Sequence, residues 1–262
     1  MRVSKKRYRI KKKKSIFKNK FFWIIISIIL FLGFSLWLII FSPIFQIKTV
    51  LVSGNEKISI NEIEQSVYLR TETKLLFLNT KSIFLIDTKS IENDILKNYP
   101  IIDNLKIKKL LPSSLSIEMV ERKKIALWSK TDTYFAIDKK GIAFEETNKE
   151  PKEDLVIISK QHEGEVSLKS EVINEKILSQ ILTIKKTISD KINIETNEFT
   201  IFESEARLNV KTTENWEIYF YLEGDLNWQL IELELTLEKQ LPQEKRHNLE
   251  YIDLRFSKVY YK

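Results

Sequence analysis

Hydrophobic residues form their longest uninterrupted run near the start of the chain, from Phe21 to Phe41. This run contains no charged residue, Asn or Gln. As a helix, its twenty-one residues reach about 31 Å, which matches the hydrocarbon core of a bilayer. A cleaved signal peptide has a shorter apolar region and paired small residues at its cleavage site, which the following SPIFQ segment lacks. The pattern predicts an uncleaved transmembrane helix over residues 21–42.

The pattern from residue 43 to residue 122 predicts a small sheet with two helices. A strand is expected from Phe45 to Gly54, because β-branched residues end there in a Gly-Asn turn. Ser59 lies three residues before Glu62, the spacing of a capping box. In the first expected helix, Ile60, Ile63 and Val67 recur at helical intervals. A second helix is expected between a cap at Thr88 and Pro100, and its apolar positions are Ile91, Ile95, Leu96 and Tyr99.

Two further strands follow, because apolar and polar residues alternate on both sides of a turn at Pro112. The apolar positions are Leu105, Ile107, Leu115, Ile117 and Met119. The predicted order is β-α-α-β-β, with both helices on one face of the sheet.

The remaining residues, 123–262, predict a second domain of mixed α+β class with a mainly antiparallel sheet. A hairpin over residues 133–146 turns at Asp138 to Gly141, and a helix is expected over residues 171–188. Strands are expected over residues 192–203, 206–212 and 216–222, followed by a helix that Asp225 caps and whose buried stripe is Leu226, Leu230, Leu233, Leu237 and Leu241.

Aromatic residues in the last of these strands allow two interpretations. Trp216, Tyr219 and Tyr221 have strand spacing, which favours core and cross-strand packing over a stacking platform for bases. Trp128, in the ERKKIALW segment, looks exposed.

The segment YIDLRF near the end of the sequence predicts a strand with one core face. Ile252, Leu254 and Phe256 alternate with Tyr251, Asp253 and Arg255. A strand placed last in a sheet has unpaired N–H and C=O groups, which are a template for a strand of another protein. The alternative is a surface strand on which Asp253 and Arg255 only pair with each other, an interaction of about 0–1 kcal/mol if exposed.

Charge is concentrated at one end of the chain. The 262 residues carry a net charge of +7, but residues 1–20 contain eleven Lys and Arg residues and no acid, which leaves −4 for the remainder. The basic character therefore gives no support for a nucleic-acid partner. Because cytoplasmic flanks retain Lys and Arg, residues 1–20 are predicted to be a cytoplasmic tail near the lipid surface, with the C-terminal part outside the cytoplasm.

Catalytic, metal-binding and nucleotide-binding patterns are absent from the sequence. Cys is absent, no two of the five glycines lie close together, and His162 and His247 belong to no metal motif and are predicted at the surface. Neighbouring acids such as Glu145 with Glu146, or Glu203 with Glu205, are poorly placed as an acid/base pair. We therefore predict no enzyme activity, no metal, no cofactor and no small-molecule substrate.

Three segments together resemble the bacterial cell-division family FtsQ/DivIB, whose membrane-proximal module is a POTRA domain. They are FQIKTVLVSGNEKIS, NYPIIDNLKIKKLLPSSLSIEMVERKKIALW and YIDLRF. The resemblance covers nearly the whole chain and implies a POTRA domain over residues 43–122 and a β domain over residues 123–262. Lys124 stands where the family usually has proline, which removes a fixed φ at the junction.

The resemblance implies a single-pass scaffold of the division septum in the cytoplasmic membrane, with FtsB/DivIC-like and FtsL-like partners that help to regulate septal wall synthesis. The implied partner-binding residues are Tyr251, Asp253, Arg255, Phe256, Val259 and Tyr260. Ile107 and Lys109 match a region implicated in recruitment. A POTRA-bearing chaperone of polypeptide transport or envelope assembly is the alternative function, and an extracytoplasmic enzyme is a third.

Overall fold

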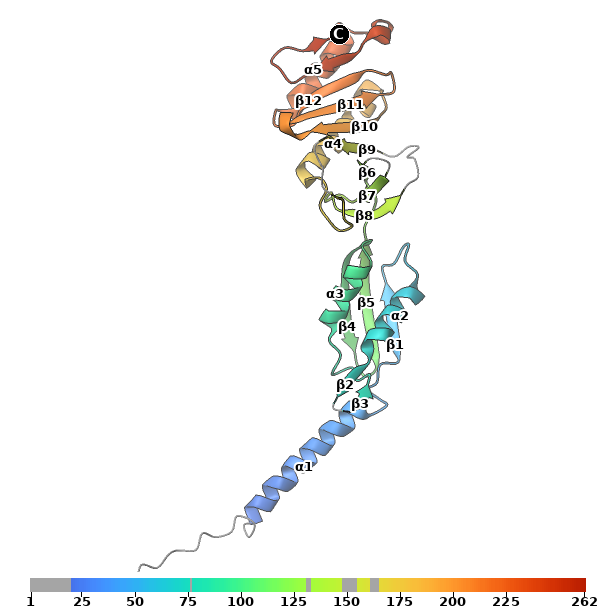
Figure 1. Cartoon of the computed structure of the whole chain (residues 1–262), viewed down its shortest axis with the longest axis vertical. Helices are drawn as coiled ribbons and strands as arrows, with labels where there is room; N and C mark the ends of the chain where they lie inside the picture. Colours follow the sequence, from blue (N-terminus) through green and yellow to red (C-terminus); the bar gives the residue numbers. More distant parts are fainter. Residues whose placement is uncertain (1–19, 76, 131–132, 148–154, 161–164) are drawn as a thin grey trace, which may run out of the picture. The chain divides into compact units, whose positions relative to one another are not determined.

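The computed structural model describes residues 20–75, 77–130, 133–147, 155–160 and 165–262. The predicted cytoplasmic tail, apart from Lys20, and His162 lie outside these residues. By contacts between residues, the chain divides into two compact units. Unit 1 contains residues up to Asn93 together with Lys106–Glu118, and unit 2 contains Asp94–Leu105 together with Met119–Lys262. Figure 1 labels the helices and most of the strands of both units.

Unit 1 begins with helix α1, Lys20–Phe41, which has no buried residue. Among the described helices it alone is long and apolar enough to cross a membrane, by length and composition. The predicted apolar helix is confirmed.

A small sheet has the order β1-β5-β4, in which β1 and β5 run parallel. Most of it belongs to unit 1, whereas its residues 102–105 and 119–121 belong to unit 2. Its strands are β1 (Thr49–Ser53), β4 (Ile102–Leu110) and β5 (Ser114–Glu121). The helices α2 (Ile60–Thr71) and α3 (Thr88–Asn98) bury Ile63, Val67, Ile91 and Ile95. The predicted β-α-α-β-β order is therefore confirmed.

Helix caps fix the starts of both helices. Ser59 caps α2, because its side chain accepts a hydrogen bond from the Glu62 N–H at 3.3 Å, as the capping-box spacing predicts. In α3, Thr88 is the first helical residue, and the Asp87 carboxylate before it accepts the N–H groups of Lys89 and Ser90. Helix α3 therefore begins one residue earlier than a cap at Thr88 implies, and its cap is Asp87 instead of Thr88.

A short hairpin lies between α2 and α3, where the sequence predicts only a loop. It consists of β2 (Thr73–Leu75) and β3 (Leu78–Thr80), which pair in antiparallel register. Each strand has three residues, which is too short to show the alternation that identifies a strand in a sequence.

Unit 2 contains a sheet whose order over the described residues is β14-β13-β12-β11-β10-β9-β6-β7-β8. The parallel pairs are β13 with β12, β10 with β9 and β9 with β6, and the other neighbours are antiparallel. The sheet is thus mainly antiparallel, as predicted. Its strands are β6 (Ala126–Lys130), β7 (Thr133–Ile137), β8 (Ala143–Thr147), β9 (Val156–Ser159), β10 (Thr196–Phe202), β11 (Arg207–Thr212), β12 (Glu217–Tyr221), β13 (Tyr251–Asp253) and β14 (Tyr260–Tyr261).

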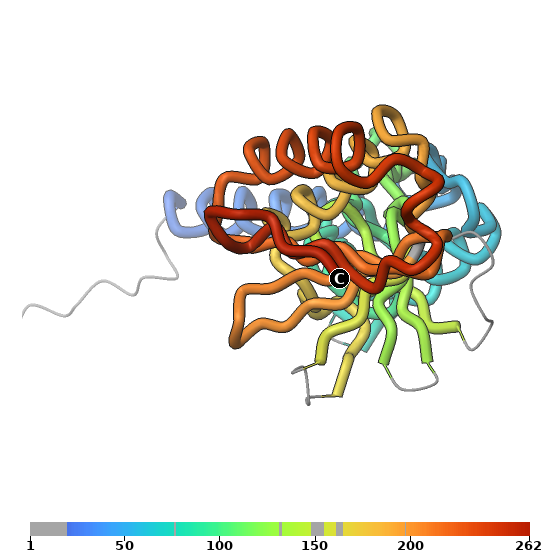
Figure 2. The backbone as a smooth tube through the Cα atoms, turned by 90° about the horizontal axis from the view of Figure 1, so that it is seen from above, coloured from blue at the N-terminus to red at the C-terminus, as the bar shows by residue number. Residues whose placement is uncertain are grey.

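Two helices pack against one face of this sheet. Helix α4, Glu175–Thr187, follows its cap Asn174 and begins four residues later than predicted from residue 171. Helix α5, Leu226–Lys239, is capped by Asp225, whose side chain accepts the Trp228 N–H at 3.1 Å, as predicted. Figure 2 shows the coil of α5 alongside the terminal strands. The shared core contains Ile181 and Ile184 of α4, Leu233 and Leu237 of α5, and Phe199, Leu208, Val210, Ile218, Phe220 and Ile252 of the strands.

The ERKKIALW segment supplies the link into this sheet. β5 ends at Glu121, and β6 begins at Ala126. The expectation that Trp128 is exposed is wrong, because its side chain is only 1% exposed within the core. The sequence also gave no sign of β9, which lies between β6 and β10.

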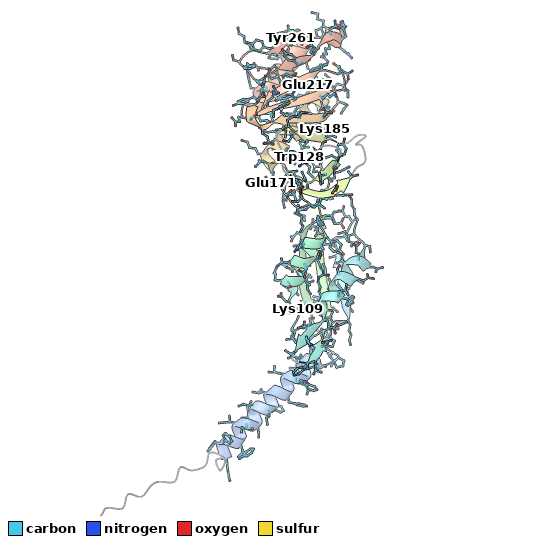
Figure 3. The ribbon with its side chains drawn as sticks, viewed as in Figure 1. Lys109, Trp128, Glu171, Lys185, Glu217 and Tyr261 are labelled. Atoms are coloured by element: carbon cyan, nitrogen blue, oxygen red, sulfur yellow. The ribbon has the colours of Figure 1, made fainter. Side chains whose placement is uncertain are left out.

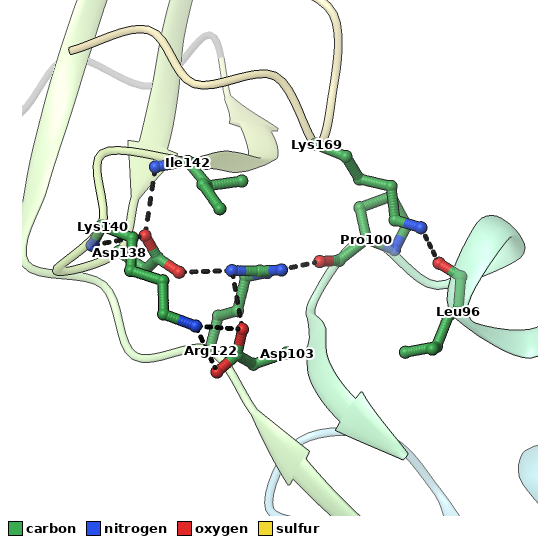
Figure 4. A network of polar contacts seen from close by, with 8 residues as sticks. All are labelled: Leu96, Pro100, Asp103, Arg122, Asp138, Lys140, Ile142 and Lys169. Carbon is green, nitrogen blue, oxygen red and sulfur yellow. Dashed lines mark hydrogen bonds and ion pairs between the residues drawn. The ribbon is translucent and has the colours of Figure 1, made fainter. Parts of the chain in front are cut away.

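Arg122 anchors this segment within unit 2 (Figure 4). Its side chain is 9% exposed and forms ion pairs with Asp138 and, at 3.0 Å, with Asp103. Its Nε donates to the Pro100 carbonyl at 3.2 Å. Lys140 Nζ adds a 3.2 Å contact to Asp103. Nearby, the Lys169 ammonium donates to the Leu96 carbonyl, and burial, with the Arg122 charge, lowers the pKa of Lys169.

The turn between β7 and β8 requires glycine at Gly141, whose φ is +73°. A Cβ atom there would lie 1.9 Å from the Ile173 carbonyl oxygen. The Asp138 carboxylate accepts the N–H groups of Lys140 and Ile142 and completes the predicted turn.

We predict that Gly141→Ala lowers the free energy of unfolding by at least about 2 kcal/mol, because both left-handed strain and overpacking apply. Urea unfolding of the full chain in detergent would measure this. Gly33→Ala is the control, because a Cβ there meets no atom within 4 Å. Equal stabilities of the two variants would contradict the close approach.

Candidate partner-binding edge of the large sheet

The YIDLRF segment is not the outermost strand of the sheet, contrary to the sequence-based expectation. Its strand β13 is flanked by β12 on one side and by β14 on the other. Tyr260 and Tyr261 pair with Asp253 and Ile252, and the Lys262 N–H donates to the Tyr251 carbonyl at 3.2 Å. The chain returns after a bend and covers this margin with its own backbone. Over the described residues, the edge of the sheet is β14.

The register of β14 determines which of its peptide groups point outward. In an antiparallel pair, every second residue directs its N–H and C=O toward the neighbouring strand. Lys262 is bonded in this way to Tyr251, and Tyr260 is two residues away, so both face β13. The peptide groups of Tyr261 therefore point away from the sheet. Tyr261 is labelled in Figure 3.

The start of β8, at the opposite end of the sheet, is covered. The Ala143 N–H donates to the Ser170 carbonyl at 3.0 Å, and the Lys169 N–H donates to the Ala143 carbonyl at 2.6 Å. A non-strand segment of the chain thus occupies the outer side of β8 at this point. The two ends of the sheet differ in this respect.

Aromatic and arginine side chains form a cluster on the face of the sheet that the helices do not cover. Tyr251 stacks on Tyr219 with ring centroids 5.2 Å apart. The Arg255 guanidinium lies 5.8 Å from the centroid of Tyr219 and 5.3 Å from that of Phe256. The Arg207 guanidinium lies 5.6 Å from the centroid of Tyr219 and 4.0 Å from that of Phe202. We call these six residues the aromatic-arginine cluster.

Asp253 and Arg255 hold the cluster in place. Asp253 is 5% exposed, and its carboxylate accepts the Arg255 backbone N–H at 3.1 Å, Nε at 2.9 Å and Nη2 at 2.7 Å. The alternative that the two residues pair with each other is thus realised, but with a buried carboxylate in a bidentate contact, which is stronger than an exposed pair. Asp253 positions Arg255 and is too buried to contact a partner through its side chain.

The electrostatics of the cluster follow from these contacts. The hydrogen bonds to Asp253 raise the pKa of Arg255 above its ordinary value, against the effect of burial. Burial raises the pKa of the Tyr219 hydroxyl, and the Glu217 carboxylate raises it further. Both side chains keep their ordinary charge at neutral pH, Arg255 positive and Tyr219 neutral.

The other predicted partner-binding residues lie at the bend and in β14. Phe256, which the alternation places on the core face, is instead 54% exposed, because β13 ends at Asp253. Its ring packs edge-on against Tyr260, with centroids 5.8 Å apart. Val259 is half-buried against the core of unit 2. The structure thus brings Tyr251, Arg255, Phe256 and Tyr260 together, and adds Tyr219, Arg207, Phe202 and Tyr261, which the sequence had not marked as partner-binding.

The predicted recruitment residues Ile107 and Lys109 differ in accessibility. Lys109 is exposed in β4 (Figure 3), whereas Ile107 is 5% exposed. A side chain this buried cannot contact a partner directly. The Ile107 N–H, on the outer side of β4, donates to the Glu92 carboxylate at 2.7 Å. Glu92 therefore occupies this edge of the small sheet at Ile107.

Comparison with known proteins identifies the region that contains the small sheet. Residues 45–122 match the family described as POTRA domain, FtsQ-type. These residues are a POTRA domain of the FtsQ type. The resemblance to the FtsQ/DivIB family is confirmed by this match and by similar proteins that are named DivIB or FtsQ.

The chain is 30% identical over 146 residues to the cell division protein DivIB of Clostridium botulinum strain Hall. The matched region covers 55% of this chain and 49% of the relative. It is 28% identical over 103 residues to DivIB of Clostridium acetobutylicum, and this match covers 39% of this chain and 38% of the relative. It is 27% identical over 124 residues to the cell division protein FtsQ of Chloroflexus aggregans, and this match covers 47% of this chain and 42% of the relative. The matches thus span less than half the length of these relatives.

The contact between Glu92 and the edge of the POTRA sheet predicts a dependence of stability on pH. Burial raises the pKa of Glu92, but the Ile107 N–H and the Lys89 ammonium, 2.7 Å away, outweigh it and hold the pKa below its ordinary value of 4.5. A carboxylate with a lowered pKa stabilises the fold above its unfolded-state pKa, and the stabilisation is lost as the pH falls through the folded-state pKa.

We predict that Glu92→Ala costs about 1–3 kcal/mol of unfolding free energy at pH 7, because the Ile107 N–H loses its acceptor. Below pH 4.5 the difference from the wild type should shrink. Urea unfolding across this range would test it, with Glu92→Gln, which keeps an oxygen acceptor, as the milder control. A difference that stays constant with pH would contradict a role for the charge.

Proposed function

We propose that this chain is a membrane-anchored scaffold of bacterial cell division that binds partner proteins by strand addition at the edge of β14. The observation that carries the proposal is the outward-facing peptide group of Tyr261 at the end of a sheet. The relatives named DivIB and FtsQ support a role in cell division. An edge with outward-facing N–H and C=O groups accepts an extended segment of another protein as one more strand.

The aromatic-arginine cluster supports the same interface. Interface hot spots are enriched in Tyr, Trp and Arg, and a side chain that is already fixed loses less conformational entropy on binding. Asp253 fixes Arg255, and Tyr219 stacks with Tyr251. In the proposal the β14 main chain gives affinity to an incoming strand, and the cluster selects its side chains.

The partners we propose are FtsB/DivIC-like and FtsL-like division proteins. With α1 in the cytoplasmic membrane and residues 1–20 inside the cell, the chain from residue 43 onward lies outside the cytoplasm, where these partners act on septal wall synthesis. Two proteins held in the same membrane meet at a raised effective concentration, so a short edge is sufficient. Lys109 of the POTRA domain remains a candidate for a recruitment surface, with Ile107 acting only through the core.

The proposed activity is binding and not catalysis. Among the described residues, no group of three or more His, Asp or Glu side chains could hold a metal ion. The contacts of the aromatic-arginine cluster are ring stacking, cation-π contacts and the Arg255–Asp253 pair, which are the contacts of a recognition surface.

We predict that deletion of residues 256–262 abolishes co-purification of the DivIC-like and FtsL-like partners from dividing cells. This deletion removes β14 but retains Ile252 and Leu254, which are 0% and 2% exposed. A deletion from residue 249 would remove these core side chains and unfold the sheet for a different reason. Unchanged or stronger partner capture after the short deletion would show that partners pair elsewhere, or with β13 after displacing β14.

A substitution at Tyr261 tests the main chain alone. Proline lacks an N–H and is tolerated in an edge strand where the N–H faces solvent. We predict that Tyr261→Pro weakens partner binding by about tenfold, which corresponds to about 1.4 kcal/mol for one lost hydrogen bond, with little change in the unfolding temperature.

Titration of a purified DivIC-like ectodomain against the full chain would measure this loss. Tyr261→Thr is the matched control, because it removes the ring and keeps the N–H. An equal loss in both variants would assign the interaction to the side chain instead of the backbone.

A further inference from the structure

The end of α1 is hydrogen-bonded to the POTRA domain within unit 1. The Gln46 side chain donates to the Ile40 carbonyl at 2.8 Å and accepts the Lys81 N–H at 2.8 Å. The Thr80 hydroxyl lies 3.3 Å from the same Ile40 carbonyl. The last carbonyls of a helix have no partner within it, and these side chains supply one. The hairpin β2–β3 is thereby held beside the last turn of α1 (Figure 1).

Exposed apolar side chains surround this junction. The Phe77 side chain, at the tip of the β2–β3 hairpin, is 93% exposed, and Leu111, in the turn between β4 and β5, is 65% exposed. We call the set the junction patch, which consists of Ile44, Phe77, Leu78, Phe84, Leu110 and Leu111.

Hydrogen bonds and register place the parts of the junction patch near the helix end. Leu78 is two residues from Thr80 in β3, a separation of about 7 Å along a strand. The turn that holds Leu111 is adjacent to Lys48, because the Lys48 N–H donates to the Ser113 carbonyl at 2.9 Å. Phe84 stacks obliquely with Phe45 at 5.1 Å, next to the bridge between Gln46 and Ser82.

Lysine side chains lie among these apolar residues. Lys48, Lys74 and Lys81 are exposed on or beside the same strands and turns. Exposed aromatic and aliphatic residues bordered by Lys are the arrangement by which proteins lie in the interface of an anionic bilayer. A water-facing tip would leave Phe77 with no apolar contact surface.

We propose that the junction patch is a lipid-binding surface that inserts into the interface of the bilayer in which α1 is anchored, with the lysines on anionic headgroups. This rests on the membrane anchoring of the proposed function. The patch continues the apolar surface of α1 from the membrane onto the POTRA domain. Insertion at the hairpin and at the β4–β5 turn adds two contacts to the helix, so the POTRA domain keeps one orientation on the membrane.

The absence of cysteine from the chain allows a direct depth measurement. Phe77→Cys, Leu111→Cys and Ile60→Cys would each carry an environment-sensitive fluorophore, in the full chain reconstituted alone into phosphatidylglycerol–phosphatidylcholine vesicles. A second set of vesicles contains lipids with a nitroxide near the glycerol backbone. Ile60 is the control, because it is an exposed apolar residue at the end of α2 that lies away from the junction patch. The end near the patch is marked by Tyr68, whose hydroxyl donates to the Lys48 carbonyl. Ile60 is about 12 Å by helix rise from Tyr68.

We expect the labels at positions 77 and 111 to lose most of their emission in nitroxide vesicles, and the label at position 60 to lose little. Vesicles of phosphatidylcholine alone should reduce the quenching at position 77. If the chain floats with the vesicles and position 77 is quenched no more than position 60, the lipid assignment is wrong and anchoring stands. Burial of position 77 only when division partners are added would assign the patch to a protein. A chain that does not float would overturn both the anchoring and the inference.

Discussion

A sheet must end in a strand whose outer peptide groups have no partner within the sheet, and the way this chain treats its edges determines what it can bind. Unpaired edges invite pairing with other chains, including unwanted ones. At the POTRA sheet, the Glu92 carboxylate occupies the Ile107 N–H of β4. In the large sheet, Lys169 and Ser170 occupy the start of β8. At β14 the edge extends only over Tyr260 and Tyr261. The open edge at β14 is the one that we propose for a partner strand.

Much of the fold follows from periodicity and caps in the sequence. The spacing of Ile63 and Val67, the cap at Ser59 and the cap at Asp225 are local features, and each fixes an element without reference to the rest of the chain. β6 escaped prediction for a physical reason. Its residues Ala126, Leu127 and Trp128 are all buried. Ala126 and Trp128 lie in the core on the helix side, and Leu127 packs against Ala136 and Phe144 on the other side. A strand covered on both faces shows no alternation.

The candidate site could be predicted only in part, because it is assembled from residues distant in the sequence. The alternation in YIDLRF places Tyr251 and Asp253 on one face, but nothing local shows that Tyr219 and Arg207 lie beside them. β14 was missed because it has two residues and pairs after a bend. Ile107 illustrates the converse. Its place in the apolar alternation of β4 predicts a buried side chain, and the side chain is buried in the structure. The resemblance had implied an exposed, partner-contacting role for it.

The membrane anchor compensates for the low affinity of a short strand edge. A two-residue strand offers few main-chain hydrogen bonds, and each contributes about 0.5–1.5 kcal/mol net. Alone, such an edge binds a free strand weakly, and for the same reason it does not recruit unrelated chains. A partner held in the same membrane needs far less intrinsic affinity, because its effective concentration is high. Selectivity then has to come from side chains, and the aromatic-arginine cluster, fixed by Asp253, lies on the face of the sheet beside β14. In the proposed arrangement, weak main-chain pairing and rigid side-chain recognition would limit capture to proteins that share the bilayer.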